Sequence, residues 1–229
     1  MTDRDLEGAS IVVAGASGGI GRQIAIQLAG HGARLTLTAR DQSALEALGI
    51  DATVVPADLR DGHAGRAIVS AALSANNGID GLVNAAGIVA FGSLAETDDA
   101  VVEELFLTNV LGPLWLIRAA LPALTASRGF IANISAVVAE QPLAGMTAYA
   151  ASKAALTAAD RALSRELRVA GVTVTDARPP HTETGLATRP IAGNAPRLPR
   201  GLDPDAVASR IIAAIRAGER EVPADAFGP

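Results

Sequence analysis

Short runs of β-branched and apolar residues alternate along this chain with longer helical patterns. The expected strands are Ser10–Ala14, Arg34–Thr38, Thr53–Val55, Gly81–Asn84, Phe130–Ser135 and Thr173–Ala177. The expected helices lie near Ile20–His31, Ser43–Leu48, Gly62–Ala75, Ala100–Ala126 (interrupted at Gly112-Pro113) and Thr147–Ala170. Because strands and helices alternate, we predict a doubly wound parallel sheet with helices on both faces, a three-layer α/β/α fold.

The length and composition fit one soluble domain. The 229 residues suit a single domain spanning residues 1–229, long enough to bury a large core. Hydrophobic residues make up 49% and aromatic residues only 3%, so the core must be aliphatic and rich in alanine. The absence of cysteine excludes a disulfide framework, a thiolate metal site and a thiol nucleophile, and suits a reducing compartment.

Charge and hydropathy narrow the possible partners. The charged start Met1–Asp5 lacks the apolar core of a signal peptide. The longest apolar run, between Phe106 and Ile117, is interrupted, so we expect no membrane span. The formal net charge is −5 and the arginines are scattered, so nucleic acid is not an expected partner. We therefore expect a cytoplasmic protein that acts on a small molecule and needs no metal.

A polar stretch rich in proline and glycine follows the last expected strand. It begins at Arg178-Pro179-Pro180, covers residues 180–202, and precedes a final helix at residues 203–217. A loop of this length in a small domain is typically a lid or a binding loop. Ligands of open parallel sheets bind beyond the carboxyl ends of the strands, so functional residues should follow each strand directly.

The first strand leads into a glycine-rich turn that opens a helix. The turn contains Gly15, Ser17, Gly18, Gly19, Ile20 and Gly21. Glycines allow a sharp turn and a close approach of main chain to a pyrophosphate, while the helix N-terminus offers unpaired N–H groups. Tight strand–helix turns need glycine in any case, but the position directly after a strand favours a dinucleotide site.

The only tyrosine, Tyr149, lies four residues before the only lysine, Lys153. That spacing is about one helical turn and places both side chains on one face. A phenol is a poor acid–base catalyst at neutral pH unless a nearby cation stabilises its phenolate. The pair therefore indicates a catalytic group, although chance in a chain poor in lysine would give the same spacing.

The glycine spacing Gly-x-x-x-Gly-x-Gly and the Tyr-x-x-x-Lys pair resemble the classical short-chain dehydrogenase/reductase family over nearly the whole chain. Further family landmarks follow in order: Asp58-Leu59, Asn84-Ala85-Ala86-Gly87, Asn109 and Ser135. The resemblance implies a Rossmann-type fold. The extended branch of the family carries a larger C-terminal domain, for which this chain has no room.

The resemblance also implies catalytic roles. Tyr149 would exchange a proton with the substrate oxygen during hydride transfer. Lys153 would bind the nicotinamide ribose and lower the pKa of Tyr149. Asn109 would hold the kink and the water of a proton relay, and Ser135 would bond the substrate oxygen. A structural role for Asn109, with its amide bonded to main chain, is the alternative.

Other positions would bind the cofactor by the same resemblance. Asp58 and Leu59 would meet the adenine, and Asn84, Ala85, Ala86 and Gly87 would line the ribose. Pro179, Thr182 and Thr184 would contact the nicotinamide or the pyrophosphate. The plain alternatives are a helix cap for Asp58 and a tight turn at the end of the fourth strand.

The end of the second strand bears on which nicotinamide is used. Family members specific for NAD place an acid where this chain has Ala39, and Arg40 follows. A guanidinium matches a 2′-phosphate in charge and geometry. We therefore expect NADP(H) rather than NAD(H), the alternative being a surface arginine paired with Asp41.

Two departures from the family pattern affect the site. The catalytic serine usually lies thirteen residues before the tyrosine, where this chain has Ala136, and Ser135 lies fourteen before it. Neighbouring strand residues face opposite ways, so either the following loop absorbs the extra residue, which we favour, or the catalytic hydroxyl is missing. Pro180 replaces a usual glycine, and the adjacent His181 is more typical of a loop than of a general base.

Together these features predict an NADP(H)-dependent oxidoreductase acting on a small hydrophobic ketone or secondary alcohol. The expected pocket wall is apolar and contains Val137, Val138, Pro142, Leu143 and Met146. A non-catalytic dinucleotide sensor or scaffold on the same fold is the alternative, and a dehydratase or epimerase is a third reading. Relatives commonly assemble through the helices flanking the fifth strand, so a homodimer or homotetramer is expected.

Overall fold

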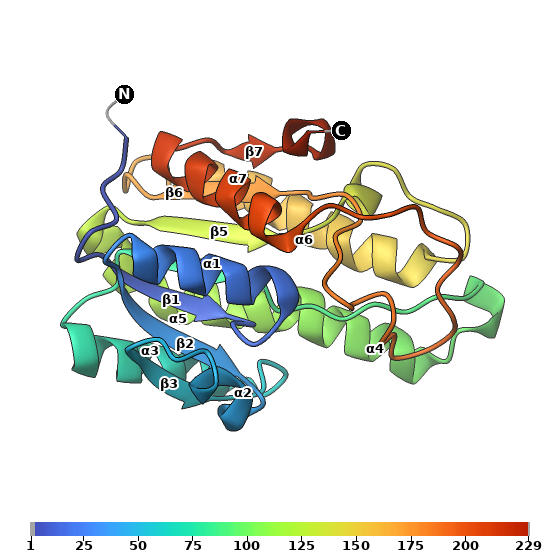
Figure 1. The fold of residues 1–229 in the computed structure, drawn as a ribbon, viewed down its shortest axis with the longest axis horizontal. Coiled ribbons are helices and arrows are strands. Elements are labelled where there is room, and N and C mark those ends of the chain that lie inside the picture. The colour runs from blue at the N-terminus through green and yellow to red at the C-terminus, as the bar shows by residue number, and fades with distance from the viewer. Residues whose placement is uncertain (1–2, 229) are drawn as a thin grey trace.

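The computed structural model describes residues 3–228, and within them a sheet of seven parallel strands forms the centre of the molecule (Figure 1). The strand order is β3-β2-β1-β4-β5-β6-β7. The strands are β1 (Ser10–Ala14), β2 (Arg34–Ala39), β3 (Ala52–Pro56), β4 (Gly81–Asn84), β5 (Phe130–Ile134), β6 (Thr173–Ala177) and β7 (Glu221–Val222). The doubly wound parallel sheet is confirmed, and β1, β4 and β6 have the expected bounds.

The helices are α1 (Gly19–Gly30), α2 (Gln42–Glu46), α3 (Ala64–Asn76), α4 (Asp99–Phe106), α5 (Gly112–Ser127), α6 (Thr147–Glu166) and α7 (Pro204–Ala217). Alternate residues of each strand face opposite sides of the sheet. On β1, Ile11 and Val13 share a core with α1 and α7, whereas Val12 shares the opposite core with α3 and α5. The two apolar layers explain why the strands read as continuous apolar runs.

The long helix before β5 is not broken at Gly112-Pro113, contrary to expectation. The chain passes from α4 through a π-helical turn, Leu107–Leu111, directly into α5. Pro113 lies in the first turn of α5, where a proline is tolerated. Within residues 3–228, the span Asp99–Ser127 is the one helical stretch long and apolar enough to cross a membrane by length and composition alone. Leu116, Ala120 and Leu124 of this span are buried in the core.

The sheet reverses its winding between β1 and β4, which pair with each other at the centre. The turns that follow these two strands therefore leave a crevice at their carboxyl ends. Residues 180–202 form the lid and cross this edge. The lid is bonded to the segment after β4, because Ile191 N donates to Val89 O at 2.9 Å and Phe91 N donates to Ala192 O at 3.0 Å.

Candidate active site

A cavity of about 740 Å³ lies at the carboxyl ends of the strands, between the sheet, α6 and the lid. It brings together most of the predicted site residues, namely Gly15, Ser17, Gly18, Gly19, Ile20, Arg40, Asp58, Leu59, Ala85, Ala86, Gly87, Ser135, Tyr149, Lys153, Pro179, Thr182 and Thr184. Gly21, Asn84 and Asn109 do not line it.

Three glycines of the turn after β1 have no room for a side chain. Gly15 has a φ of +77°, and a Cβ there would lie 2.5 Å from Ala86 N. A Cβ on Gly21 would lie 2.2 Å from Gly15 O, and one on Gly19 would lie 2.3 Å from the Cβ of Thr184. The first-turn N–H groups of α1 have no partner inside the helix. The turn therefore offers an open main-chain surface and a positive helix end, which fit a pyrophosphate.

The far end of the cavity, beyond β2 and β3, is charged. Arg60 Nη2 donates to Asp58 Oδ2 at 2.6 Å, and Arg60 Nη1 donates to Glu104 at 2.8 Å. The hydrogen bond from Arg60 lowers the pKa of Asp58, so this carboxylate is held charged and oriented. Asp41 accepts from Ala44 N at 3.2 Å and caps α2, and within residues 3–228 Arg40 takes part in no ion pair. Arg40 is exposed at the cavity wall.

Two buried asparagines, Asn84 and Asn109, lie outside the cavity lining and hydrogen-bond to neighbouring elements of the site. Asn109, in the π-helical turn, accepts from Ile88 N at 2.9 Å and donates to Ile88 O at 3.0 Å. Its amide therefore fixes the segment that follows β4. A Cβ on Gly87 would lie 3.3 Å from Lys153 Nζ and 3.4 Å from Asn109 Oδ1, so a glycine lets these groups approach. Asn84 donates to Asn133 at 2.6 Å.

Tyr149 and Lys153 are both buried on α6, with 6% and 4% of their surface exposed. Lys153 Nζ donates to Ile134 O at 2.9 Å. Burial lowers the pKa of Lys153 to about 8, with Asp176 acting in the opposite sense. Tyr149 lies in an apolar cluster with Phe91, Val138 and Met146. Burial raises the pKa of Tyr149, which is opposite to the lowering we expected, so the phenol is protonated at neutral pH.

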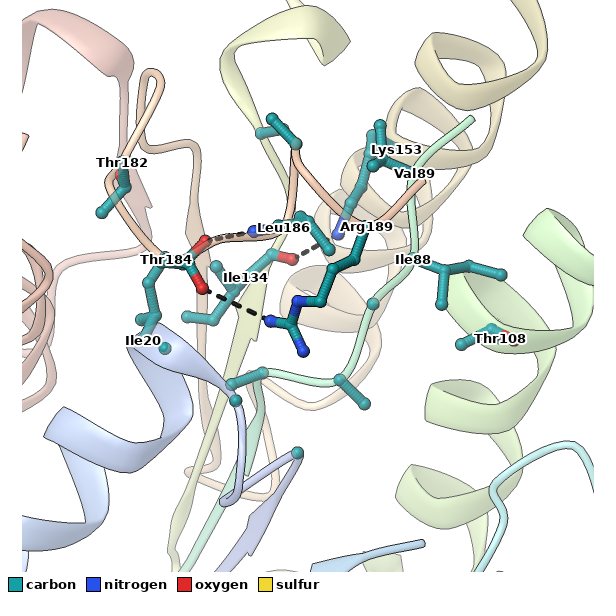
Figure 2. Close-up of a pocket in the computed structure, with 18 of the residues that line it drawn as sticks. Ile20, Ile88, Val89, Thr108, Ile134, Lys153, Thr182, Thr184, Leu186 and Arg189 are labelled. Atoms are coloured by element: carbon teal, nitrogen blue, oxygen red, sulfur yellow. Dashed lines mark hydrogen bonds between the residues drawn. The ribbon is translucent and has the colours of Figure 1, made fainter. Parts of the chain in front are cut away.

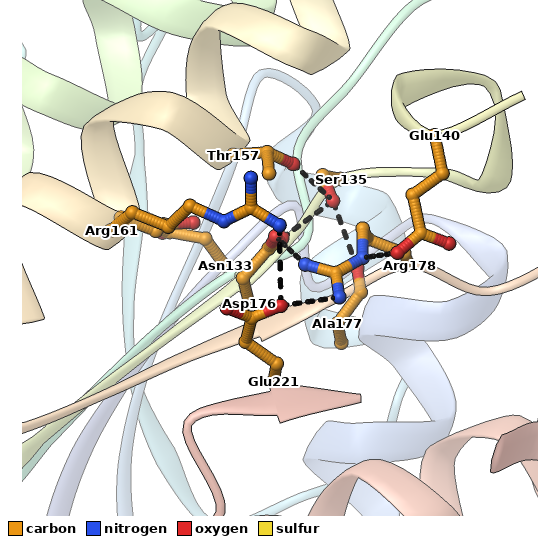
Figure 3. A network of polar contacts seen from close by, with 10 residues as sticks. Asn133, Ser135, Glu140, Thr157, Arg161, Asp176, Ala177, Arg178 and Glu221 are labelled. Carbon is orange, nitrogen blue, oxygen red and sulfur yellow. Dashed lines mark hydrogen bonds and ion pairs between the residues drawn. The ribbon is translucent and has the colours of Figure 1, made fainter. Parts of the chain in front are cut away.

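The hydroxyl of Ser135 does not suit the expected role at the substrate oxygen. Ser135 Oγ donates to Asp176 Oδ1 at 2.5 Å and accepts from Thr157 at 3.2 Å (Figure 3). Only 3% of the residue is exposed, so its single proton is committed to a buried carboxylate. Ala136, at the usual spacing, lines the cavity without a hydroxyl. Ser135 itself lines the cavity, but this hydrogen bonding does not support the expectation that the following loop absorbs the extra residue and turns the hydroxyl toward the substrate.

A buried ion network that we did not predict joins the end of β6 to strand β7 and to the turn after β5. Arg178, 2% exposed, donates to Asp176 at 2.5 Å and to Glu221 at 2.7 Å, and it pairs with Glu140 at 2.5 Å (Figure 3). The signal available in the sequence was Asp176 within an expected strand, followed two residues later by Arg178. Because Glu140 follows the turn Val137–Ala139, the network anchors the pocket wall to the sheet.

The threonines after β6 have separate partners. Thr182 Oγ1 donates to Pro180 O at 2.9 Å, which keeps this proline-containing turn closed. Thr184 Oγ1 accepts from Leu186 N at 3.2 Å, and Arg189 approaches the same turn (Figure 2). Pro179 O accepts from Val137 N at 3.1 Å, so the lid begins against the pocket wall. His181 lines the cavity, with Nε2 3.7 Å from Glu183.

Comparisons with known proteins agree on one family. A family model described as short chain dehydrogenase matches residues 9–193. The chain is 32% identical over 224 residues to an uncharacterized oxidoreductase of Staphylococcus saprophyticus, covering 93% of both chains. It is 32% identical to the ketoacyl reductase HetN of Nostoc, covering 95% of this chain and 78% of the relative. A crystal structure of a short-chain dehydrogenase from Streptomyces avermitilis matches with a TM-score of 0.81 at 30% identity, covering 90% of this chain and 84% of that chain.

Proposed function

This chain belongs to the short-chain dehydrogenase family, and from that premise we propose that it is an NADP(H)-dependent oxidoreductase for a small hydrophobic ketone or secondary alcohol. One observation carries the proposal: Tyr149, Lys153 and the glycine turn after β1 line the same cavity. An acid–base group and a pyrophosphate surface in one cavity are what hydride transfer to a carbonyl requires.

Tyr149 acts as the general acid in carbonyl reduction. Its raised pKa keeps the phenol protonated at neutral pH, so a proton is available when the carbonyl oxygen gains negative charge. The bound nicotinamide supplies the hydride. Lys153, buried beside Gly87, places a positive charge at the ribose end of the cavity and favours charge that develops on the oxygens near it.

The substrate side of the cavity favours an apolar ketone. The cluster around Tyr149 contains Val89, Phe91, Val138 and Met146, and Leu186 and Ile191 of the lid pack against it. An apolar enclosure excludes water and strengthens the hydrogen bond from the phenol to the substrate oxygen. The name of the Nostoc relative, a ketoacyl reductase, points in the same direction because its name describes a ketone on an acyl group.

Arg40 supports NADP(H) over NAD(H). It lines the cavity after β2, and Asp41, the residue that would otherwise neutralise it, is bonded to the start of α2. Ala39 adds no negative charge at this position. A free guanidinium here is placed to pair with a 2′-phosphate.

The test is a panel of ketones and alcohols assayed with NADPH and NADP+, alongside Tyr149→Phe. We expect turnover of apolar ketones with NADPH, and its loss in the variant while cofactor binding persists. Tight cofactor binding with no turnover of any panel member would contradict the proposed activity.

A non-catalytic dinucleotide sensor is the second candidate, and one observation favours it. Ser135 lines the cavity but its hydroxyl donates to Asp176, and Ala136 beside it has no hydroxyl to face Tyr149. A sensor would bind dinucleotide and respond with a change in the lid, without product. Product formation by the wild-type chain excludes this candidate.

A further inference from the structure

The lid carries an arginine, Arg189, that is exposed to solvent and lines the cavity. Arg189 lines the cavity together with Gly15, Gly19 and Ile20. Its Nε donates to Gly185 O at 3.1 Å, and its Nη2 approaches Thr184 O at 3.4 Å. Figure 2 shows the side chain running from the lid into the cavity, with the guanidinium on the side of Thr184. These two solvent-exposed contacts orient the guanidinium and leave other N–H donors of its fork unused.

Thr184 places this guanidinium beside the start of α1. A Cβ on Gly19 would lie 2.3 Å from the Cβ of Thr184 and 2.8 Å from its Cα, so the lid packs directly on the first turn of the helix. Because Arg189 is bonded to the carbonyl of Thr184 and lines the same cavity as Gly19, its charge lies close to the helix N-terminus. An anion in that space would meet main-chain N–H groups on one side and a guanidinium on the other.

The glycine turn itself supplies no cation for that anion. Residues Gly15 to Gly21 include no lysine, arginine or histidine. Lys153 is bonded to Ile134 O, further along the cavity, and Arg40 follows β2 at the other end. Arg189 is therefore the charged side chain of the cavity best placed to neutralise a pyrophosphate.

We propose that Arg189 is a cofactor-binding residue that holds the pyrophosphate of the dinucleotide from the lid, opposite the glycine turn. The inference rests on the proposed function and deepens it. The other anion that a guanidinium recognises in such a cavity is a substrate carboxylate. That role fits less well, because Tyr149 lies in an apolar cluster and the guanidinium is tied to Thr184 and Gly185.

The test measures binding to the full-length chain by calorimetry, without turnover. The ligands are NADP+, NAD+ and ADP-ribose, which share the pyrophosphate and differ at the 2′-phosphate and the nicotinamide. For Arg189→Ala we expect all three dissociation constants to rise by the same factor, about tenfold or more. The ratio between NADP+ and NAD+ stays unchanged. Arg189→Lys keeps the charge but not the fork, so its constants fall between those of Arg189→Ala and the wild type.

Arg197→Ala is the matched control. Arg197 lies on the same lid and is exposed, and it is absent from the cavity lining of the described structure. We expect its dissociation constants to stay within about twofold of wild type. Thermal melts give a second readout: Arg189→Ala should melt like wild type without ligand and gain less from NADP+.

Three results would overturn the proposal. ADP-ribose binding that is unchanged in Arg189→Ala removes Arg189 from the pyrophosphate. Cofactor affinities that stay constant while the KM of a carboxylate-bearing substrate rises assign Arg189 to the substrate. A wild-type chain that binds none of the three ligands overturns the dinucleotide site as a whole, which is distinct from losing Arg189 alone.

Discussion

The two halves of the cavity differ in which atoms form their surface. Beyond β1, the surface is main chain, and it exists because Gly15, Gly19 and Gly21 have no side chain to fill it. Beyond β5 and on α6, the surface consists of side chains, Tyr149 and Lys153 among them, whose positions depend on buried partners. The glycine half depends on the absence of side chains, whereas the half on α6 depends on the buried contacts of its side chains.

This difference determines how each half tolerates change. In the glycine half, one added methyl group meets main chain that has nowhere to move, so the damage is steric and local. We call the other half the catalytic half after the role proposed for Tyr149. In it, Ser135, Asp176 and Arg178 form one buried network, and Lys153 is bonded to the adjacent strand β5. A substitution there alters hydrogen bonding and charge at a distance, and its effect divides between stability and activity.

Removal of the Tyr149 hydroxyl should have the largest effect, because it should reduce turnover without changing cofactor binding. Without its acid, Tyr149→Phe should lose about 10²–10⁴-fold in kcat/KM, the usual range for a general acid. The dissociation constant of the cofactor should stay within about twofold, because the glycine half is untouched. Steady-state kinetics and calorimetry on the same preparation measure both quantities. Retained turnover in the variant would place the acid elsewhere.

A methyl group on Gly15 should damage the opposite half. The Cβ of Gly15→Ala would lie 2.5 Å from Ala86 N at a φ of +77°, so the turn must shift. We expect cofactor affinity to fall about a hundredfold, or about 2.8 kcal/mol, because the main-chain N–H groups that would hold the pyrophosphate shift with the turn.

Gly30→Ala is the matched control, since a Cβ there meets nothing within 4 Å. It is the last residue of α1, and we expect unchanged binding and a gain in unfolding free energy below about 0.5–1 kcal/mol, the range typical of a helix interior. Similar affinities for the two variants would show that the turn does not hold the cofactor closely.

Arg40 tests whether the glycine half also selects the cofactor. Arg40→Ala should weaken NADP+ binding about tenfold and leave NAD+ binding nearly unchanged, because only NADP+ carries the 2′-phosphate. Dissociation constants for both cofactors check this. An NADP+ preference that survives the substitution would assign the discrimination to another residue.

The pH dependence reports on the charge of the catalytic half. Lys153 has a pKa of about 8 because burial disfavours its ammonium, so the charged form is lost as the pH rises through that value. Since the pKa of Tyr149 is raised, the phenol stays protonated over the same range. We expect kcat/KM for reduction to fall about tenfold per pH unit above this point. In Asp176→Asn the fall should begin at lower pH, because Asp176 raises the pKa of Lys153.

Ser135 should have the smallest effect on activity. Ser135→Ala removes a donor to Asp176, which should cost about 1–3 kcal/mol in unfolding free energy and change turnover by less than about twofold. Ala136→Ser places a hydroxyl at the cavity wall, so turnover by this variant should exceed that of the wild type. A large loss of turnover in Ser135→Ala, with the cofactor still bound, would restore Ser135 to the substrate oxygen.

The fold and the glycine half were largely predictable from the sequence. Strands such as β1 and β4 show as apolar runs because both faces of the sheet are covered, and the glycine turn follows β1 without interruption. Apolar runs and a glycine turn next to a strand are visible in a few consecutive residues, so they can be predicted without knowledge of distant contacts. The strand β7 was missed because its two residues are too few to show a period.

The sequence was enough to predict that Tyr149 and Lys153 line one cavity, but not the direction of the Ser135 hydroxyl. The spacing to Tyr149 left two options for Ser135, and the choice depends on Asp176, 41 residues away in sequence. The Arg178 network likewise joins Glu140 to Glu221. The helix around Gly112-Pro113 continued because the π-helical turn before it accommodates the proline, which composition does not reveal.

Transfer of deuterium from NADPH labelled at nicotinamide C4 to a ketone tests the central claim most directly. If the two halves cooperate in one reaction, mass spectrometry of the alcohol formed by the wild-type chain will show a single deuterium on the carbinol carbon. Tyr149→Phe should bind the labelled cofactor and form far less of this product. A wild-type chain that binds the cofactor yet yields no deuterated alcohol from any ketone would contradict the proposed oxidoreductase activity. The non-catalytic dinucleotide sensor would then be the remaining candidate.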